Sequence, residues 1–561
     1  MKFFKLFLVL LLLPSHIVLE ARTIEFIPGL AQLNEQNLSD YPVVRLDSLR
    51  GGMNIHFLIP KIDTKENNSF EEISVKGLNL TSDLHRPKLP FYSILVESLP
   101  EDIKIEMQKG TEVSLENFKP LPQEDLPCRC DSPKKLEPFN EAVYQEKQNF
   151  HYKKEYIGDF RGTPITRLLV FPSSFDGSTQ KTIFYPQSSF FISHKNKKHF
   201  NIFSLKNHLL DTRKNEINKK IFVMGSSSLL KELTQWVNFK KSLGFSIDLV
   251  SFDNLEKTAE NLRKFIHERW KNPKTRFGHA LLIGHEKNFP TFYVPTSSNS
   301  ETPSDLSYFT MGGEEDFIPE VFYGRLVADS SQDVKNQIQK ILNQEKAKIS
   351  EKNSYIFGMA SNEGSNPTDS EYLGRMLKPF DKTLKNLTVQ KFLQDDPNST
   401  PEEVLKAFGK NSLWTHYIGH GSGTEWVNLH QQRGFSIEHV SQLPKHSLFP
   451  IVIDVSCQNG RFTYQDRLGE RLINAKNESG PLGPVAYYGG SVDISWHPPA
   501  IMAIGISEFA NSAEGKKLGL GPTLLSGHLA LLQQHSVKKD FQENITWYHL
   551  MGDPTIRLPS N

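Results

Sequence analysis

From residue 217 onwards, short apolar stretches alternate with amphipathic ones, and this alternation restricts the fold more than any other feature. The apolar stretches read as strands and include KKIFVMGSS, HALLIGH, EVFYGRL, SYIFGMAS, LWTHYIGH and FPIVIDVSC. Between them lie segments with helical periodicity, such as TAENLRKFIHERWK, DSEYLGRMLKPF and PEEVLKAF. Apolar strands that alternate with amphipathic helices indicate an α/β fold, with a mostly parallel sheet covered by helices on both faces. We therefore predict one α/β domain over residues 217–561.

Residues 22–216 follow a different pattern. Short segments with period-two alternation, such as NIHFLIPKI, TRLLVFPSSF and KTIFYPQSSFFIS, are separated by turns rich in Pro, Asn and Lys. This pattern predicts a separate β-rich domain. The polar stretch LLDTRKNEINKK joins the two parts and reads as an exposed linker.

The N-terminus predicts export. Lys2 and Lys5 precede an apolar run that ends at Leu13, too short to span a bilayer but typical of a signal peptide over residues 1–21. No later stretch is apolar enough to cross a membrane, so we expect a secreted, periplasmic or cell-envelope protein without stable membrane insertion. The net charge of +1 argues against nucleic acid as a partner.

A histidine and a cysteine follow two of the predicted strands. LWTHYIGH ends at His420, and the strand IVIDVS is followed by Cys457. Parallel strands of one sheet present their carboxyl ends at a shared edge, where α/β proteins bind ligands. A thiolate that attacks a carbonyl and an imidazole that protonates the leaving amine would suit cysteine-dependent acyl transfer.

Each residue also has a simpler interpretation. A lone cysteine in an apolar strand more often only fills space in the core, and a single histidine near a turn is usually a polar side chain exposed to solvent. A zinc site with His416, His420 and Cys457 is a third reading, but no CxxC or HExxH spacing supports it.

These residues lie in motifs that resemble the gingipain family of cysteine peptidases, which belongs to the same clan as caspases, legumain and clostripain. HYIGHGSGTEW resembles the histidine motif of that family, IDVSCQNGRF its nucleophile motif and ASNEG the segment with its catalytic acid. PEVFYGRL and HLMGDPTIRL also fit, and the resemblance runs from about residue 217 to residue 558. It implies a caspase-like fold.

The resemblance implies a role for each matching residue. Cys457 would be the nucleophile, His420 the general acid/base and Glu363 the acid that orients the histidine. The N–H groups of Gly421 and Cys457 would form the oxyanion hole. Trp496 would wall the primary specificity pocket. Asp369 would bind a basic side chain there, although it reads equally well as a carboxylate at a helix N-terminus.

The family further implies an exported endopeptidase, acting on proteins or peptides, that is made as a latent precursor. Residues 22–216 would be a propeptide-like domain, and we predict a cut between residues 211 and 219. No cofactor is required, and the resemblance allows a structural calcium ion. The alternatives are a processing peptidase or transpeptidase of a secretion pathway, and an inactive peptide-binding homologue.

Two further cysteines, Cys128 and Cys130, are separated by one residue. This spacing is too short for an easy mutual disulfide, so we expect surface thiols or pairing with another chain. Their role is left open.

Overall fold

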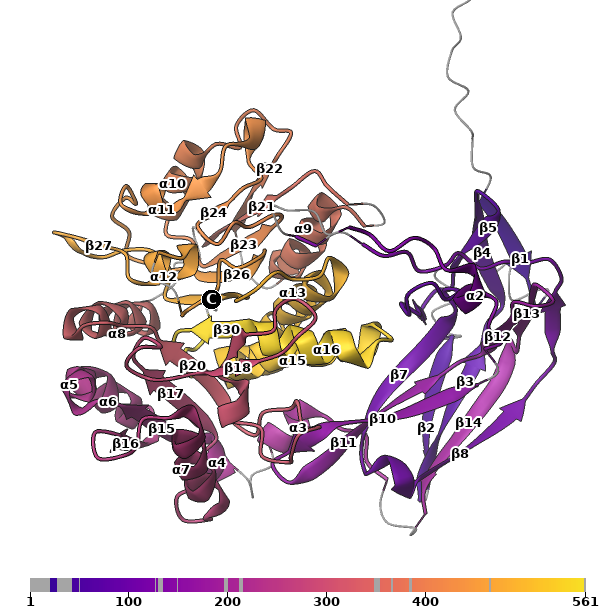
Figure 1. Cartoon of the computed structure of the whole chain (residues 1–561), viewed down its shortest axis with the longest axis horizontal. Helices are drawn as coiled ribbons and strands as arrows, with labels where there is room; N and C mark the ends of the chain where they lie inside the picture. Colours follow the sequence, from indigo (N-terminus) through magenta and orange to yellow (C-terminus); the bar gives the residue numbers. More distant parts are fainter. Residues whose placement is uncertain are drawn as a thin grey trace, which may run out of the picture.

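The computed structural model of the chain describes residues 21–27, 43–49, 51–126, 128–129, 135–148, 150–195, 200–210, 215–347, 354–364, 367–382, 386–463 and 466–558. Figure 1 shows a β-rich N-terminal region beside a larger α/β region. The predicted signal peptide lies outside the described residues, apart from Ala21. No helix in the described ranges has the length and apolarity needed to cross a membrane.

The N-terminal region consists of antiparallel sheets, as the alternating sequence predicts. One sheet has the strand order β2 (Val44–Leu49), β3 (Gly52–Leu58), β14 (Gln187–His194), β8 (Ile103–Lys109). A second has the order β10 (Tyr152–Phe160), β11 (Thr163–Val170), β7 (Pro90–Glu97), β6 (Asn79–Leu80). Two smaller sheets contain β12 (Ser173–Asp176), β13 (Lys181–Phe184), β9 (Val113–Leu115), and β1 (Ala21–Glu25), β4 (Lys61–Asn67), β5 (Phe70–Ser74). Short helices are α2 (Glu141–Tyr144), α3 (Leu205–Leu210) and α4 (Asn215–Asn218).

The α/β region is built on a ten-stranded sheet. Its order is β16 (Ser246–Ser251), β15 (Lys220–Gly225), β17 (His279–Ile283), β20 (Phe322–Leu326), β30 (Tyr548–Met551), β29 (Ala486–Gly490), β26 (Ile451–Val455), β23 (Trp414–Ile418), β21 (Ser354–Ala360), β22 (Leu387–Leu393). Neighbouring strands pair in parallel except β29 with β30, which are antiparallel. The prediction of a mostly parallel sheet is confirmed.

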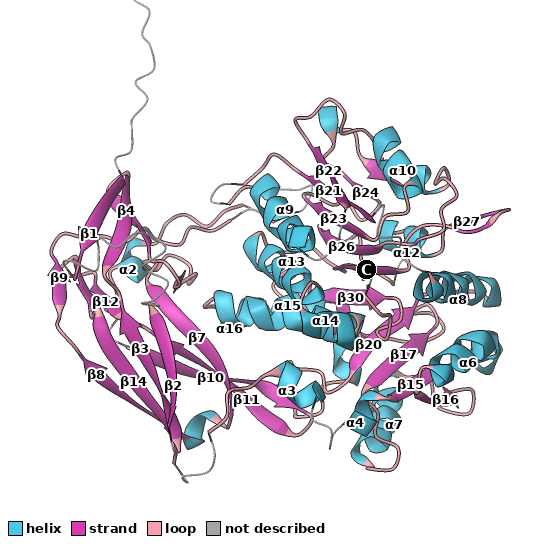
Figure 2. Ribbon diagram, turned by 180° about the vertical axis from the view of Figure 1, so that it is seen from behind, coloured by secondary structure: helices cyan, strands magenta, loops and turns pink. Residues whose placement is uncertain are grey.

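Helices cover both faces of this sheet (Figure 2). Because strand side chains alternate between faces, Trp414 and Ile418 of β23 join one apolar cluster while Tyr417 joins another. The first cluster includes residues of α5 (Ser227–Leu230), α6 (Thr234–Ser242), α8 (Ser331–Lys346), α9 (Asp369–Leu377), α13 (His497–Ala510) and α15 (Leu520–Gln534). The opposite face is covered by α7 (Ala259–Lys271), α10 (Pro401–Gly409), α11 (Ile437–Val440) and α12 (Leu468–Ile473). Helices α14 (Ala513–Leu518) and α16 (Lys538–Trp547) complete the region.

The two regions share one apolar cluster. Ile157 and Phe160 of β10 pack in it with Phe322 of β20 and Leu529 of α15. Beside it, the buried Arg167 guanidinium donates to the carbonyl oxygens of Leu532, His535 and Ser536, at 2.7–2.9 Å, where α15 ends. These carbonyls have no partners within the helix, so the N-terminal region caps α15.

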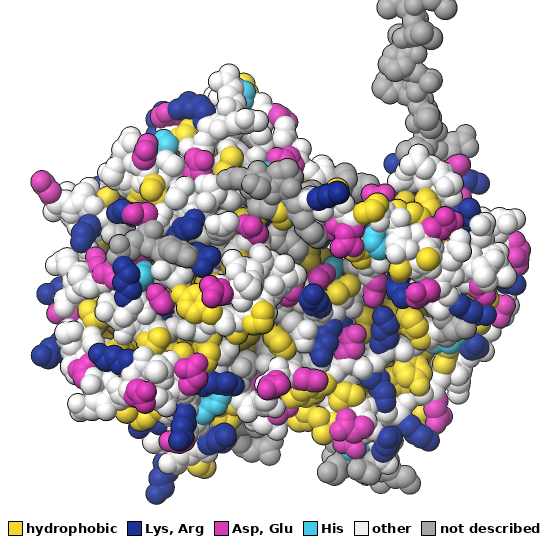
Figure 3. Space-filling view, viewed as in Figure 1, with side chains coloured by type: hydrophobic (Ala, Val, Ile, Leu, Met, Phe, Trp, Pro, Cys, Tyr) yellow, Lys and Arg dark blue, Asp and Glu magenta, His cyan; other side chains and the backbone are white. Residues whose placement is uncertain are grey.

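The visible surface carries no single-sign patch. Figure 3 shows basic and acidic side chains interspersed over the face that it draws, including the part over the β-rich region. This distribution agrees with the net charge of +1.

Candidate functional site

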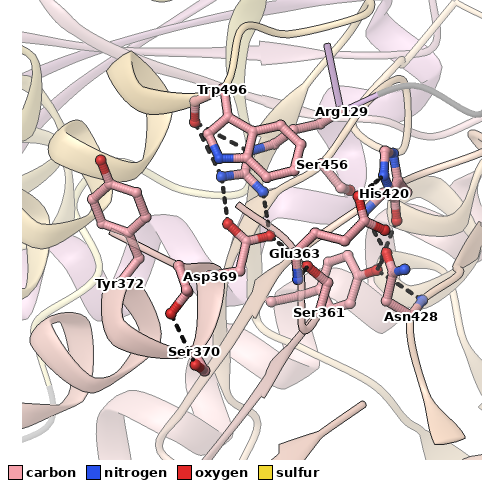
Figure 4. Close-up of polar contacts among 12 residues, drawn as sticks. Arg129, Ser361, Glu363, Asp369, Ser370, Tyr372, His420, Asn428, Ser456 and Trp496 are labelled. Carbon is pink, nitrogen blue, oxygen red and sulfur yellow. Dashed lines mark hydrogen bonds and ion pairs between the residues drawn. The ribbon is translucent and has the colours of Figure 1, made fainter. Parts of the chain in front are cut away.

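Three neighbouring parallel strands deliver the predicted site residues to one edge of the sheet. Strands β26, β23 and β21 lie side by side. Cys457 follows β26, His420 follows β23 and Glu363 follows β21. The three strands lie next to one another in the sheet in their chain order, so their carboxyl ends place the three residues at one edge. Figure 4 labels His420 and Glu363 there.

His420 and Glu363 form a hydrogen-bonded pair. The His420 Nε2 atom lies 2.8 Å from Glu363 Oε2. This hydrogen bond raises the pKa of His420 against the opposing effect of burial, and it lowers the pKa of Glu363. The second ring nitrogen, Nδ1, is buried without a hydrogen-bond partner in the described structure. The ring therefore has one nitrogen fixed by the carboxylate and the other available to a reacting group.

Asn428 and Tyr417 hold the histidine backbone. The His420 N–H donates to Asn428 Oδ1 at 2.6 Å, and the Tyr417 hydroxyl donates to the His420 carbonyl at 2.7 Å. Asn428 also forms a side-chain hydrogen bond to Glu363, which helps to lower the pKa of that carboxyl. One amide thus positions both members of the pair. Sequence reasoning missed Asn428, although it lies only two residues beyond the histidine motif.

Cys457 is completely buried in this structure. Its Sγ accepts a hydrogen bond from the Ile494 N–H at 3.2 Å. Burial raises the pKa of the thiol well above its usual range, and the nearby Asp493 carboxylate adds to the effect. The covered site therefore favours the thiol over the reactive thiolate.

The residue that fills the predicted specificity pocket is Arg129 of the N-terminal region. Its guanidinium makes two hydrogen bonds to the Asp369 carboxylate, Nη1–Oδ2 at 2.6 Å and Nη2–Oδ1 at 2.7 Å, and both side chains are fully buried. It also donates to the Trp496 carbonyl and stacks on the Trp496 ring, with Cζ 4.2 Å from the ring centroid. Ser361 Oγ donates to the same carboxylate at 2.7 Å. Figure 4 shows this arrangement.

Asp369 lies at a helix N-terminus and also binds a guanidinium of this chain. It is the first residue of α9, with Thr368 as the N-cap, and it also binds the guanidinium. Its backbone N–H donates to the Glu363 carbonyl at 2.9 Å, which ties the pocket to the segment that carries the catalytic candidate. Trp496 lies immediately before α13, and its ring lies against the Arg129 guanidinium.

The backbone of Arg129 also contacts the segments around His420 and Cys457. Its carbonyl oxygen accepts a hydrogen bond from the Gly421 N–H at 3.3 Å, and its N–H donates to the Ile494 carbonyl at 3.2 Å. A side chain at position 421 would not fit, because a Cβ there would lie 2.4 Å from the Cys457 carbonyl oxygen. The Gly421 N–H thus donates to a carbonyl at the position where no side chain would be accommodated.

The structure does not bring the three zinc candidates together as a ligand set. His416 is buried within the sheet, where its Nε2 lies 3.2 Å from Ser507 Oγ. Burial lowers the pKa of His416 to about 3. In the described ranges, no group of three His, Cys, Asp or Glu side chains is placed to hold a metal ion.

The expectation of a surface thiol is wrong for Cys128. This residue, next to Arg129 in sequence, is disulfide-bonded. Cys130 lies outside the described residues, so its role stays open. Sequence reasoning noted the two cysteines and overlooked the arginine between them.

A family model described as peptidase family C25 matches residues 214–559. Among curated proteins, the chain is 23% identical over 519 residues to "Gingipain R1" of Porphyromonas gingivalis, covering 86% of this chain and 50% of the relative. It is 25% identical over 352 residues to "Gingipain R2" of P. gingivalis, covering 60% of this chain and 46% of the relative. The chain therefore spans about half the length of these relatives.

The fold also matches a solved structure, "Complex of Porphyromonas gingivalis RgpB pro- and mature domains". The TM-score is 0.55 at 24% identity, covering 61% of this chain and 80% of the solved chain. At this identity, the likeness establishes the fold alone.

The Glu363 carboxylate stabilises the charged imidazolium of His420, so its removal should lower the histidine pKa. We expect Glu363→Gln to move the His420 titration to lower pH, as measured by NMR of the imidazole ring in the full chain. The exposed Glu438, replaced by Gln, is the matched control and should leave the titration unchanged. An unchanged His420 pKa in Glu363→Gln would contradict the pairing.

Proposed function

The chain belongs to peptidase family C25, and on this premise we propose that it is a cysteine endopeptidase with a preference for Arg before the scissile bond. The observation that carries the proposal is the position of Arg129. Its side chain fills a pocket formed by Asp369 and Trp496, and its carbonyl contacts Gly421 beside His420 and Cys457.

In this mechanism, the Cys457 thiolate attacks the carbonyl carbon of the substrate arginine, and the bond from that carbon to the next nitrogen breaks. Glu363 holds His420 through Nε2, so the free Nδ1 can take the thiol proton and deliver it to the leaving amine. The Gly421 N–H, together with that of Cys457, stabilises the oxyanion. Water then hydrolyses the thioester, with His420 as the general base.

The specificity follows from charge and shape. A planar guanidinium makes two parallel hydrogen bonds to a carboxylate, which the ammonium of lysine cannot reproduce. Stacking on an indole ring adds a cation–π interaction. The pocket thus suits Arg better than Lys, and an uncharged side chain would leave the Asp369 carboxylate buried without a counter-ion.

We further propose that residues 22–216 act as a propeptide that keeps the precursor latent. Arg129 occupies the pocket as a substrate would, and the covered thiol is held protonated. The predicted cut between residues 211 and 219 remains part of the proposal; residues 211–214 lie outside the described ranges. Export also remains a prediction, as do protein or peptide substrates.

The decisive experiment for the reaction replaces Cys457 by Ala. We expect loss of peptide hydrolysis to background with the fold retained, and His420→Ala should lose a similar amount because the two residues act as a unit. Activity is measured with a peptide library, and labelling with a peptidyl electrophile followed by mass mapping locates the nucleophile. More than trace turnover by Cys457→Ala would refute the assignment, and absence of labelling in the processed wild type would favour an inactive homologue. Transfer to added amines would instead favour a transpeptidase.

The pocket is tested with Asp369→Ala and the near-isosteric Asp369→Asn. Loss of one partner of a buried charged pair costs about 2–5 kcal/mol. Both variants should therefore lower kcat/KM for Arg substrates at least tenfold, with little change for substrates with an apolar residue at that position. Equal losses for both substrate types would indicate that Asp369 only stabilises the N-terminus of α9 and does not bind the substrate side chain.

Latency is tested with Arg129→Ala in the full chain. Initial rates on a small Arg substrate, measured before processing, should be at least tenfold above those of the wild-type precursor, because the pocket is vacated. Arg129→Lys retains the charge without the two-bond geometry and should lie between the two, with circular dichroism as the folding check. If Arg129→Ala were as inactive as the wild-type precursor, a part of the N-terminal region other than Arg129 would be responsible for the inhibition.

A further inference from the structure

The turn after Cys457 is joined to the loop of residues 491–496, which follows β29. The Gln458 N–H donates to the Val492 carbonyl at 3.0 Å. The Gln458 side chain adds a second contact, because its Nε2 donates to Asp493 Oδ1 at 2.8 Å. Two hydrogen bonds from one residue therefore hold the nucleophile turn against this loop.

The backbone of Ile494 contacts both partners of the proposed reaction. Its N–H donates to Cys457 Sγ at 3.2 Å, and its carbonyl accepts from the Arg129 N–H at 3.2 Å. In the proposed function, a substrate arginine replaces Arg129, so the same residue would align the sulfur and the substrate backbone. Asp493 directly precedes Ile494, and Gln458 directly follows Cys457. Their hydrogen bond thus connects the two residues that flank the contact between the sulfur and Ile494.

Gln458 has a backbone conformation that depends on its surroundings. Its φ is +58°, in the left-handed region that residues with a Cβ atom seldom adopt. Such conformations persist where neighbouring contacts hold them, and they are frequent in active sites. Here the contacts are those to Val492 and Asp493. Loss of the side-chain contact would let the turn relax and would displace Cys457 relative to Ile494.

We propose that Gln458 and Asp493 are positioning residues, whose hydrogen bond aligns Cys457 with the bound arginine backbone and fixes a negative charge beside the sulfur. The proposal rests on the proposed function, because it concerns the alignment of that site.

The charge of Asp493 acts on the sulfur. Burial raises the pKa of the Cys457 thiol most, and the Asp493 carboxylate raises it further. The Ile494 N–H and the positive charge of Arg129 act in the opposite direction. The Gln458 amide is neutral, so its hydrogen bond leaves the negative charge in place. The sulfur therefore stays protonated until a base removes its proton.

His420 is the base in the proposed mechanism. Glu363 binds its Nε2 atom, and Nδ1 is left to accept the proton from Cys457. The Tyr548 hydroxyl is a further titratable group near the sulfur, and burial raises its pKa well above the usual range, so it stays neutral. A thiol that ionises only during attack reacts slowly with oxidants and alkylating agents between turnovers, because the thiolate is the reactive form.

The first experiment exchanges the donor and the acceptor of the hydrogen bond. Gln458→Glu keeps the length of the side chain but places a carboxylate against Asp493, and kcat for an Arg substrate should fall at least tenfold. KM should change less, because Asp369 and Trp496 still bind the arginine side chain. Gln458→Glu/Asp493→Asn has an acceptor at position 458 and a donor at position 493, so it should recover most of the lost kcat.

The exposed Gln442, replaced by Glu, is the matched control for the added charge. Circular dichroism and thermal unfolding of each variant identify any folding defect, which would lower activity without rescue by the double variant. Wild-type kcat in Gln458→Glu would refute the positioning role. A folded double variant no more active than Gln458→Glu would refute it as well.

The second experiment separates the charge from the hydrogen bond. Asp493→Asn removes the charge and keeps an oxygen that accepts from Gln458. Alkylation of Cys457 by iodoacetamide is followed against pH, in the full chain and in the processed chain, with mass mapping of the labelled residue. At mildly acid pH the variant should react at least about threefold faster than wild type, because loss of a nearby negative charge lowers the thiol pKa. Anionic iodoacetate should gain more than neutral iodoacetamide, and identical pH profiles would refute the electrostatic role.

The two hypotheses fail in different ways, because labelling does not require turnover. If neither wild type nor any variant hydrolyses peptides but Asp493→Asn still changes the labelling profile, the proposed peptidase function fails and the effect of Asp493 on the sulfur stands. If wild type hydrolyses Arg peptides and the variants change neither kcat nor labelling, the inference fails alone.

Discussion

The buried ion pair between Arg129 and Asp369 is the interaction on which the arrangement of the two regions at the site depends. Two charges without solvent are costly, and here the cost is offset because the donors and acceptors are paired: Asp369 by the guanidinium and Ser361, Arg129 by Asp369 and the Trp496 carbonyl. The pair differs from the buried Lys240–Glu345 pair, whose partners both belong to the α/β region. In the proposed function, a substrate arginine replaces Arg129 in the first pair, whereas the second pair stays in place.

The pocket residue Asp369 and the catalytic candidates are connected through one short backbone segment. The segment after β21 carries Glu363, which binds His420, and its carbonyl accepts from the N–H of Asp369. An arginine that enters the pocket thus contacts the same short segment that orients the histidine. Burial of Cys457 also holds the thiol in its neutral form. The positive charge of Arg129 acts in the opposite direction and lowers the Cys457 pKa, so the charge of the arginine partly offsets the effect of burial.

Docking of the β-rich region does not rest on one arginine. The apolar cluster around Phe160 and Phe322, and the cap that Arg167 provides for α15, hold the two regions together independently of the pocket. A cut at Arg129 alone would leave these contacts in place. This is a physical reason for expecting activation in more than one step, with release of the arginine distinct from release of the whole region.

The sequence by itself determined the periodic elements and the residues at their ends. Apolar periods of two and of 3.6 are local properties, so the strands before Cys457 and His420, the helices that flank them and the β-rich character of the N-terminal region were all predictable.

Tertiary structure alone decided the rest. Arg129 lies 240 residues from Asp369 in sequence, and no local pattern indicates that one is the counter-ion of the other. The sequence around Asp369 predicts a carboxylate at a helix N-terminus, and this local pattern does not depend on whether the carboxylate has an ion-pair partner. The contact of Asn428 with His420 could not be predicted either, because it depends on the turn that brings Asn428 back to the His420 backbone. Long-range pairing is set by how the sheet and the β-rich region pack together, and that packing is a property of the whole chain.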